Sequence, residues 1–241
     1  MSGKTTVLAF DFGASSGRAV KAVYDGAALS YEEVHRFENC PREKDGRLRW
    51  DFSALMDEVR TGLGKAGAVD SIGFDTWGVD FGLLGKNGTL LEAPVHYRDG
   101  RTAGMVEQAL RTMDARTLYG ATGNQIMAIN TLFQLLAVKE QAPEVWRRAK
   151  RLLFMPDLFI HALCERTIAS TSQMQDARTG AWDRDVLAAY RIPERLFAPS
   201  VPSGTVVGAL ENGAKVVAVA GHDTQCAVAA LPTQARDTAF L

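Results

Sequence analysis

The sequence contains 241 residues, of which 46% are hydrophobic and 23% are charged, so it has the composition of a globular protein of one or two domains. The formal net charge is −1, without a long run of one sign, which argues against nucleic acid or an acidic membrane surface as the main partner. The apolar runs are shorter than the roughly 18 residues of a membrane-spanning helix, so no membrane partner is expected.

The cysteines and histidines indicate neither a disulfide framework nor a metal site. Three cysteines, Cys40, Cys164 and Cys226, lie far apart and are odd in number. The four histidines are equally scattered. The N-terminal stretch reaches Asp11 too soon for the apolar core of a signal peptide. These features favour a protein of the reducing cytoplasm.

The first part of the chain predicts a group of strands followed by a helix. Three apolar or alternating stretches with short links, as in an antiparallel meander, cover 5–12, 17–25 and 29–39. Residues 46–50 predict a short fourth strand. Asp51 then stands at the N-cap of a stretch with helical spacing, and Gly67 stands where that helix should end.

The rest of the chain alternates strands and helices. Strands are expected over 69–85, 151–155 and 215–221, and helices within 102–149, from Pro156 and after Gly221. The polar stretch 165–213 is expected to be irregular apart from one helix near 183–190. Early strands followed by alternating elements predict an α/β domain with a mixed sheet. We expect residues 236–241 to open a further strand that begins another domain.

A loop of small residues joins the first two expected strands and reads Gly13-Ala14-Ser15-Ser16-Gly17, before Arg18. Gly13 and Gly17 permit positive φ, and successive backbone N–H groups in such a turn form a concave anion site. The serines can add hydroxyl donors and Arg18 a positive charge. Asp11, at the end of the preceding strand, can hold Mg²⁺ directly or through water. The alternative is a plain tight hairpin with a polar tip.

Three other motifs compete for this loop, and each lacks a required feature. Residues 13–17 match the G-x-S-x-G nucleophile elbow of hydrolases, but an elbow needs a helix after its serine, whereas the residues after Arg18 alternate as in a strand. A Walker A loop would need Gly-Lys followed by Ser or Thr. A dinucleotide-binding fingerprint would again need a helix, which argues against NAD.

The stretch 74–84 has two carboxylates, Asp75 and Asp80, on either side of Trp77 and Gly78. An aromatic ring beside carboxylates and a glycine suits a sugar, which has a flat apolar face and hydroxyl groups. The alternative is a set of ordinary strand-end and turn residues. We interpret the next polar segment, 96–102, as a solvated loop rather than as a partner of these carboxylates.

A further candidate site follows the apolar strand 215–221, where His222-Asp223-Thr224 opens the expected helix. A carboxylate in that position lies where α/β sheets place their ligands. Asp223 and Thr224 are both candidates for the N-cap, and Asp223 is also a candidate general base for a hydroxyl group. Since Asp11 also ends a strand, we expect two carboxylates at one edge of the sheet.

Together these motifs resemble the FGGY family of carbohydrate kinases, and within it the rhamnulokinase type. The resemblance rests on the loop 11–18, on SIGFDTWGVDFGLL at 71–84 and on Gly-His-Asp-Thr at 221–224. Shorter segments follow the same order: HRFEN (35–39), Arg49-Trp50-Asp51, Tyr97-Arg98-Asp99 with Arg101, and MPD (155–157). The loop is shared widely in the actin–hexokinase superfamily, whereas Asp-Thr-Trp-Gly-Val-Asp-Phe is far more specific. The resemblance runs from about residue 7 to the last residue.

The resemblance implies a ribonuclease H-like fold of the actin and hexokinase type, with a mixed five-stranded sheet flanked by helices. It implies an ATP-dependent kinase that phosphorylates the 1-hydroxyl of L-rhamnulose. Residues 1–235 would form the N-terminal, sugar-binding domain. Residues 236–241 would begin a C-terminal nucleotide-binding domain of related fold, the rest of which is absent from this chain. Both a monomer and a dimer are compatible with the sequence.

The resemblance also implies a role for each motif residue. Asp223 would be the catalytic base, and Asp11 would help to place Mg²⁺. The sugar would contact Trp77, Gly78, Asp80, His222 and Thr224. The ATP phosphates would contact Gly13, Ala14, Ser15, Ser16, Gly17 and Arg18.

The chain departs from the family where the second domain should begin, because the next phosphate loop of the family is absent. We therefore expect this chain alone to bind ATP weakly and to turn over poorly or not at all. One alternative is a kinase for another ketose or polyol, such as L-fuculose or xylulose. Another is a non-catalytic sugar-binding or assembly module of the actin-like superfamily. Asp11 and Asp223 argue against the latter, because binding alone needs neither a metal-placing acid nor a base.

Overall fold

The main element of the computed structural model, which describes residues 3–169, 174–231, 233 and 235, is a six-stranded mixed sheet with the order β3-β2-β1-β6-β10-β9. Its strands are β1 (Thr5–Phe12), β2 (Ser16–Tyr24), β3 (Leu29–Glu38), β6 (Ser71–Thr76), β9 (Thr205–Ala209) and β10 (Lys215–Ala218). The first three form the predicted antiparallel meander, and β1, β6 and β10 run parallel. The sheet has six strands rather than five, because β9, in a stretch expected to be irregular, pairs antiparallel with β10.

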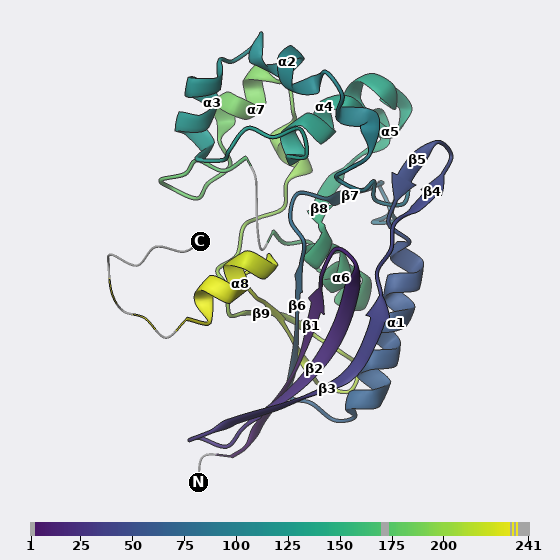
Figure 1. Cartoon of the computed structure of the whole chain (residues 1–241), viewed down its shortest axis with the longest axis vertical. Coiled ribbons are helices and arrows are strands. Elements are labelled where there is room, and N and C mark those ends of the chain that lie inside the picture. The colour runs from purple at the N-terminus through teal and green to yellow at the C-terminus, as the bar shows by residue number, and fades with distance from the viewer. Residues whose placement is uncertain (1–2, 170–173, 232, 234, 236–241) are drawn as a thin grey trace.

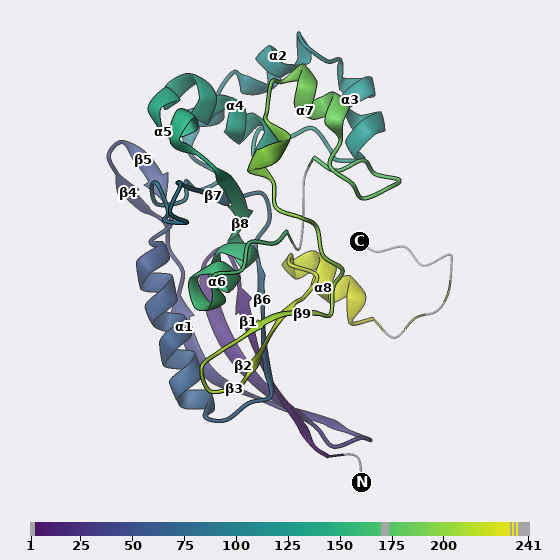
Figure 2. The same ribbon diagram turned by 180° about the vertical axis from the view of Figure 1, so that it is seen from behind.

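Two helices cover one face of this sheet, and a third lies against the other face (Figures 1 and 2). Side chains alternate along β1, so Leu8, Phe10 and Phe12 are buried beneath α1 (Phe52–Ala66) and α6 (Met155–Cys164). As predicted, the Asp51 side chain caps α1 by accepting from the Ala54 N–H at 3.1 Å, and Gly67 ends it with φ +67°. Helix α8 (Asp223–Ala229) follows β10 and lies on the opposite face.

A helical lobe with its own hydrophobic core sits at the carboxyl ends of the strands, at the top of Figure 1. Its helices are α2 (Met105–Leu110), α3 (Ala115–Thr122), α4 (Thr131–Gln141), α5 (Pro143–Arg148) and α7 (Arg184–Ala189), with short 3-10 turns at Gly100–Thr102 and Glu194–Leu196. Its two strands are β7 (Phe81–Leu84) and β8 (Arg151–Phe154). The strand expected over 69–85 is thus two strands, one in each part of the molecule.

Three further expectations concern residues 46–50, membrane-spanning helices and residues 236–241. The short strand expected at 46–50 belongs to a separate hairpin, β4 (Arg42–Lys44) with β5 (Arg47–Arg49), and not to the main sheet. Within the described part of the chain, no helix combines the length and apolar character that a membrane span requires. The further strand expected at 236–241 lies outside the described residues.

Candidate active site

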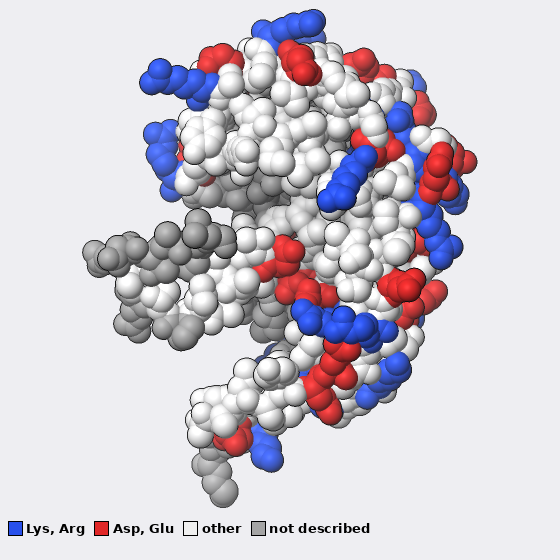
Figure 3. All heavy atoms as spheres, in the orientation of Figure 1, with Lys and Arg blue, Asp and Glu red and all other residues white. Residues whose placement is uncertain are grey.

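Three aspartates meet where the parallel strands of the main sheet end. Asp11 lies directly opposite Asp75 in the pairing of β1 with β6. The chain after β10 forms a parallel bridge between His222 and Thr76, and Asp223 follows at once. Acidic side chains gather near the middle of the molecule, beside a hollow in its surface (Figure 3). The structure thus brings Asp11 and Asp223 to one edge, as the sequence predicts, and adds Asp75.

The sequence analysis grouped Asp75 with Asp80 in a candidate sugar motif and did not place it beside Asp11 and Asp223. The signal was present, because Phe74-Asp75 ends β6 in the same way that Phe10-Asp11 ends β1. Burial, and then the nearby charges of Asp11 and Asp223, raise the pKa of Asp75 to about 7. Its Oδ1 atom is buried and has no hydrogen-bond partner among the residues that the structure describes. A proton or a cation at this edge would relieve both the repulsion and the missing partner.

Asp11 and Asp75 fit a magnesium ion that is held largely by other ligands. Among the described residues, no group of three or more His, Cys, Asp or Glu side chains could hold a metal. Mg²⁺ keeps several waters and commonly takes one or two carboxylates together with substrate phosphates. The unpartnered Asp75 oxygen next to Asp11 is compatible with that mode of binding.

The loop 13–17 forms a tight hairpin turn whose tip is exposed beside Asp11. Gly13 N–H donates to the Ser16 carbonyl at 2.9 Å, and the buried Asn39 side chain donates to the Gly13 carbonyl at 2.6 Å. The Arg18 guanidinium pairs with Asp11, with its Nη2 atom 2.6 Å from Oδ2. Since β2 begins at Ser16, a strand rather than a helix follows, as the argument against a nucleophile elbow requires.

Neither Gly13 nor Gly17 uses the positive φ that a glycine permits, because neither is among the glycines with positive φ. Gly17 is instead required by packing, since a Cβ atom there would lie 2.2 Å from the Phe37 ring. The glycine is buried beneath that ring, while Ala14 and Ser15 at the tip are exposed. The tip is therefore the part of this loop that is open to a ligand.

Helix α8 presents Asp223 to solvent at the start of its first turn. The N-cap is His222. The sequence analysis named Asp223 and Thr224 as candidates for this position, and neither of them occupies it. Among the described residues, the hydrogen-bond donors to the Asp223 carboxylate are those of its neighbour, with Thr224 N at 2.6 Å and Thr224 Oγ1 at 3.1 Å from Oδ1. Burial lowers the pKa of His222, which favours its neutral imidazole, although the Asp223 charge opposes this effect. An exposed carboxylate in this position can take a proton from a hydroxyl group.

Gly78 brings the end of β6 into contact with the imidazole of His222. A Cβ atom on Gly78 would lie 2.4 Å from Cε1 and 2.6 Å from Nδ1 of that ring. The absence of a side chain therefore allows the ring to rest on the backbone. Gly78, His222 and the exposed Asp223 and Thr224 form one continuous group at the sheet edge.

Asp80 and Trp77 lie beneath this group rather than in it. Asp80 is 1% exposed and Trp77 is 5% exposed. The Asp80 Oδ2 atom accepts from the indole N–H of Trp50 at 2.6 Å and of Trp77 at 3.0 Å, and the two indole rings lie 4.0 Å apart. This burial argues against the direct sugar contacts that the sequence predicts for both residues, and favours a supporting role.

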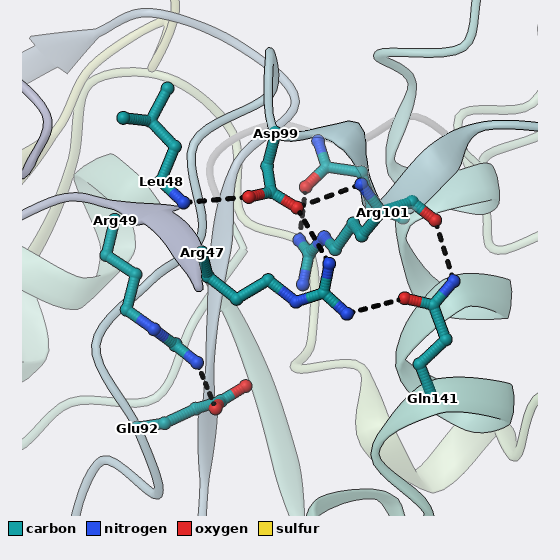
Figure 4. Close-up of polar contacts among 8 residues, drawn as sticks. Arg47, Leu48, Arg49, Glu92, Asp99, Arg101 and Gln141 are labelled. Atoms are coloured by element: carbon teal, nitrogen blue, oxygen red, sulfur yellow. Dashed lines mark hydrogen bonds and ion pairs between the residues drawn. The ribbon is translucent and has the colours of Figure 1, made fainter. Parts of the chain in front are cut away.

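The interpretation of 96–102 as a solvated loop is wrong. Asp99 and Arg101 are 8% and 7% exposed, and they join a polar cluster between the β4–β5 hairpin and α4 (Figure 4). Asp99 accepts from Leu48 N at 2.7 Å and from Arg101 N at 2.9 Å. Arg101 Nη2 donates to Gln134 Oε1 at 2.6 Å, and its charge interacts favourably with Asp80. The segment 96–102 therefore helps to hold Asp80, which lies beneath the sheet edge.

Known proteins resemble this chain in both sequence and fold. Residues 6–232 match the N-terminal domain of the FGGY family of carbohydrate kinases. The chain belongs to this family. It is 39% identical over 249 residues to a rhamnulokinase of Enterobacter sp. (strain 638), and 41% identical over 250 residues to one of Yersinia pestis bv. Antiqua (strain Angola). These alignments cover 97% and 98% of this chain but 51% and 52% of the relatives, so the chain spans about half their length.

Solved structures of carbohydrate kinases confirm the predicted fold. The xylulose kinase from Rhodospirillum rubrum matches with a TM-score of 0.79 at 17% identity, over 91% of this chain and 50% of that one. The gluconate kinase from Lactobacillus acidophilus matches with a TM-score of 0.78 at 17% identity, over 91% and 48%. At this level of identity the likeness shows the fold and carries no information about the substrate.

Proposed function

We propose that this chain forms the sugar-binding half of an ATP-dependent kinase that phosphorylates L-rhamnulose at its 1-hydroxyl. The observation that carries the proposal is the exposed Asp223 carboxylate, which stands beside His222 and Gly78 at the same sheet edge as Asp11. The two rhamnulokinase relatives support the choice of sugar.

In this proposal Asp223 acts as the general base. It accepts the proton of the 1-hydroxyl while the hydroxyl oxygen forms a bond to the γ-phosphorus of ATP and the bond from that phosphorus to ADP breaks. A positioned base of this kind contributes about 10²–10⁴-fold to the rate. His222 and Thr224 flank the sugar, and Gly78 contacts it. The exposed tip of the loop 13–17 and Arg18 face the phosphates.

Asp11 would hold Mg²⁺, and Asp75 is the second carboxylate available to the ion. When bound there, Mg²⁺ would neutralise charge on the phosphoryl oxygens. Arg18, which pairs with Asp11, is placed to exchange that carboxylate for a phosphate oxygen.

We assign residues 1–235 to this sugar-binding domain and 236–241 to the beginning of a nucleotide-binding domain. We further propose that the protein works in the cytoplasm, since Cys40, Cys164 and Cys226 are all free thiols.

The proposal is tested by thermal unfolding of the chain with L-rhamnulose, L-fuculose, xylulose and other ketoses. A ligand present at about 100 times its Kd adds about 2.7 kcal/mol to the free energy of unfolding, which gives a clear rise in Tm. We expect a selective rise with L-rhamnulose. A larger rise in Tm with another ketose would show that this ketose, and not L-rhamnulose, is the preferred sugar. Cooperative unfolding without any shift in Tm would contradict a sugar site in this chain.

A further inference from the structure

The backbone between β6 and β7 makes a strained turn next to the proposed sugar site. Val79 has φ +68°, and Asp80 N–H donates to the Gly78 carbonyl at 2.9 Å. This pattern is a three-residue γ-turn of the rare type with positive φ at its centre. A β-branched residue is unfavourable there, so the surroundings must hold the turn in place. The residue before the strained one is Gly78, which packs against His222.

Helix α4, in the helical lobe, supplies the groups that hold this turn. Thr131 Oγ1 donates to the Val79 carbonyl at 2.7 Å. Gln134 Nε2 lies 2.8 Å from the Ile129 carbonyl, 3.0 Å from Asp80 Oδ1 and 3.3 Å from the Val79 carbonyl. Its Oε1 accepts from Arg101 Nη2 at 2.6 Å. Thr131 is fully buried, and Gln134 is 1% exposed.

Gln134 contacts the turn, the carboxylate of Asp80 and the guanidinium of Arg101 at the same time. Its amide contacts the central carbonyl of the turn and the carboxylate that follows it, and its oxygen receives the buried guanidinium of Arg101. An amide can donate and accept at the same time, which neither a carboxylate nor an ammonium group can do. Removing it would leave the Arg101 guanidinium and the Asp80 Oδ1 atom short of partners in a buried environment, and the Val79 carbonyl with Thr131 as its remaining side-chain donor.

We propose that Gln134 is a positioning residue that fixes the Val79 turn and thereby sets the Gly78 backbone against His222. It does not touch the sugar in this account. Its effect passes through the turn to the Gly78–His222 contact. The consequence for sugar affinity rests on the function proposed above, whereas the geometric claim does not.

The test compares Gln134→Met with Gln141→Met. Both positions are on α4, and Gln141 also contacts Arg101, since its Nε2 donates to the Arg101 carbonyl at 2.8 Å. Gln141 has no bond to the turn among its hydrogen bonds to described residues. The first readout is the NMR signals of the histidine rings without ligand, with His35 and His161 as internal references. The second is calorimetric titration with L-rhamnulose, which gives Kd and the number of sites.

We expect the His222 ring signals to move in Gln134→Met and to stay in place in Gln141→Met. We also expect Kd for L-rhamnulose to rise at least tenfold in Gln134→Met with about one site retained, and to stay within twofold in Gln141→Met. Unchanged His222 signals in a folded Gln134→Met protein would overturn the proposal. So would a fall in the number of sites at constant Kd, which is the result of a purely structural defect.

A second variant covers the case in which Gln134→Met does not fold. Thr131→Val removes only the donor to the Val79 carbonyl and keeps the side-chain shape. It should shift the His222 signals in the same direction by a smaller amount, and unshifted signals would overturn the proposal. If the wild-type chain binds no ketose, the proposed function fails, while the histidine signals still decide whether Gln134 sets the turn.

Discussion

The aspartates at the sheet edge and the aspartate of the turn beneath it have opposite surroundings. Asp80, beneath the edge, is 1% exposed, yet its pKa rises only to about 6, because Trp50, Gln134 and Trp77 donate hydrogen bonds that oppose the effect of burial. Asp75, at the edge, is less buried, yet its pKa rises to about 7, because the charges of Asp11 and Asp223 add to the effect of burial. Burial raises the pKa of both carboxyls, and the neighbouring groups then act in opposite directions at the two positions.

The difference indicates which carboxylates are available for chemistry. Asp80 also accepts from Tyr97 N at 3.1 Å, so its oxygens have four donors and its place is fixed. Within the part of the chain that the structure describes, Asp75 leaves Oδ1 without a hydrogen-bond partner, and Asp223 accepts from Thr224 alone. A site that must bind a cation or take up a proton needs unsatisfied acceptors, and these are stable only on a framework whose own polar groups are satisfied.

Replacing Asp80 should have the largest effect on stability. Asp80→Ala leaves buried indole, amide and backbone donors without an acceptor and leaves the Arg101 charge less compensated, so we expect the free energy of unfolding to fall by about 3–5 kcal/mol. Urea denaturation followed by circular dichroism measures this. The control is Asp223→Ala at the exposed edge, which should change the same quantity by about 0.5 kcal/mol or less. Equal losses in the two variants would contradict the comparison.

Replacing Asp75 should change the pH dependence of stability. The folded-state pKa of about 7 lies above the ordinary value of 3.8 for an aspartate, so the folded protein holds this proton more tightly than the unfolded chain. The contribution of Asp75 is thus present at low pH and is lost as the pH rises from about 4 to 7. Asp75→Asn should lack this decline and should be more stable than the wild type above pH 7.

Thermal unfolding between pH 4 and 8 in the presence of a chelator measures this effect. When Mg²⁺ takes the place of the chelator, the Tm of the wild type above pH 7 should rise more than that of Asp75→Asn. The reason is that the ion offsets the repulsion between Asp75 and Asp11. Parallel pH profiles for the two proteins would show that Asp75 does not carry the unfavourable charge.

The sequence predicted the sheet and its carboxyl edge because both depend on local patterns. Alternation in β1 and β2 and the strand-ending aspartates Asp11 and Asp223 can be read residue by residue. It did not predict β9, whose pairing with β10 becomes visible only when the strands meet. It also did not distinguish Asp75 from Asp80, since both follow apolar residues and differ only in what packs around them.

The supporting network was out of reach for the same reason. The contact of Gln134 with Asp80 joins residues 54 positions apart, and that of Arg101 with Gln134 joins residues 33 apart. In the sequence, Arg101 stands among Gly and polar residues and has the appearance of a solvated loop. Only the packing of α4 over the turn shows that these polar side chains are buried together.

The most direct test of the account is the calorimetric titration of L-rhamnulose into the wild type, Gly78→Ala and Gly120→Ala. The added methyl group of Gly78→Ala would meet the His222 ring at 2.4 Å, whereas a Cβ atom at Gly120 meets nothing within 4 Å. We predict one-site binding to the wild type and to Gly120→Ala, and at least about tenfold weaker binding to Gly78→Ala, a loss of about 1.4 kcal/mol. Equal affinity in all three folded proteins, or binding to none of them, would contradict a sugar site formed by Gly78, His222 and Asp223.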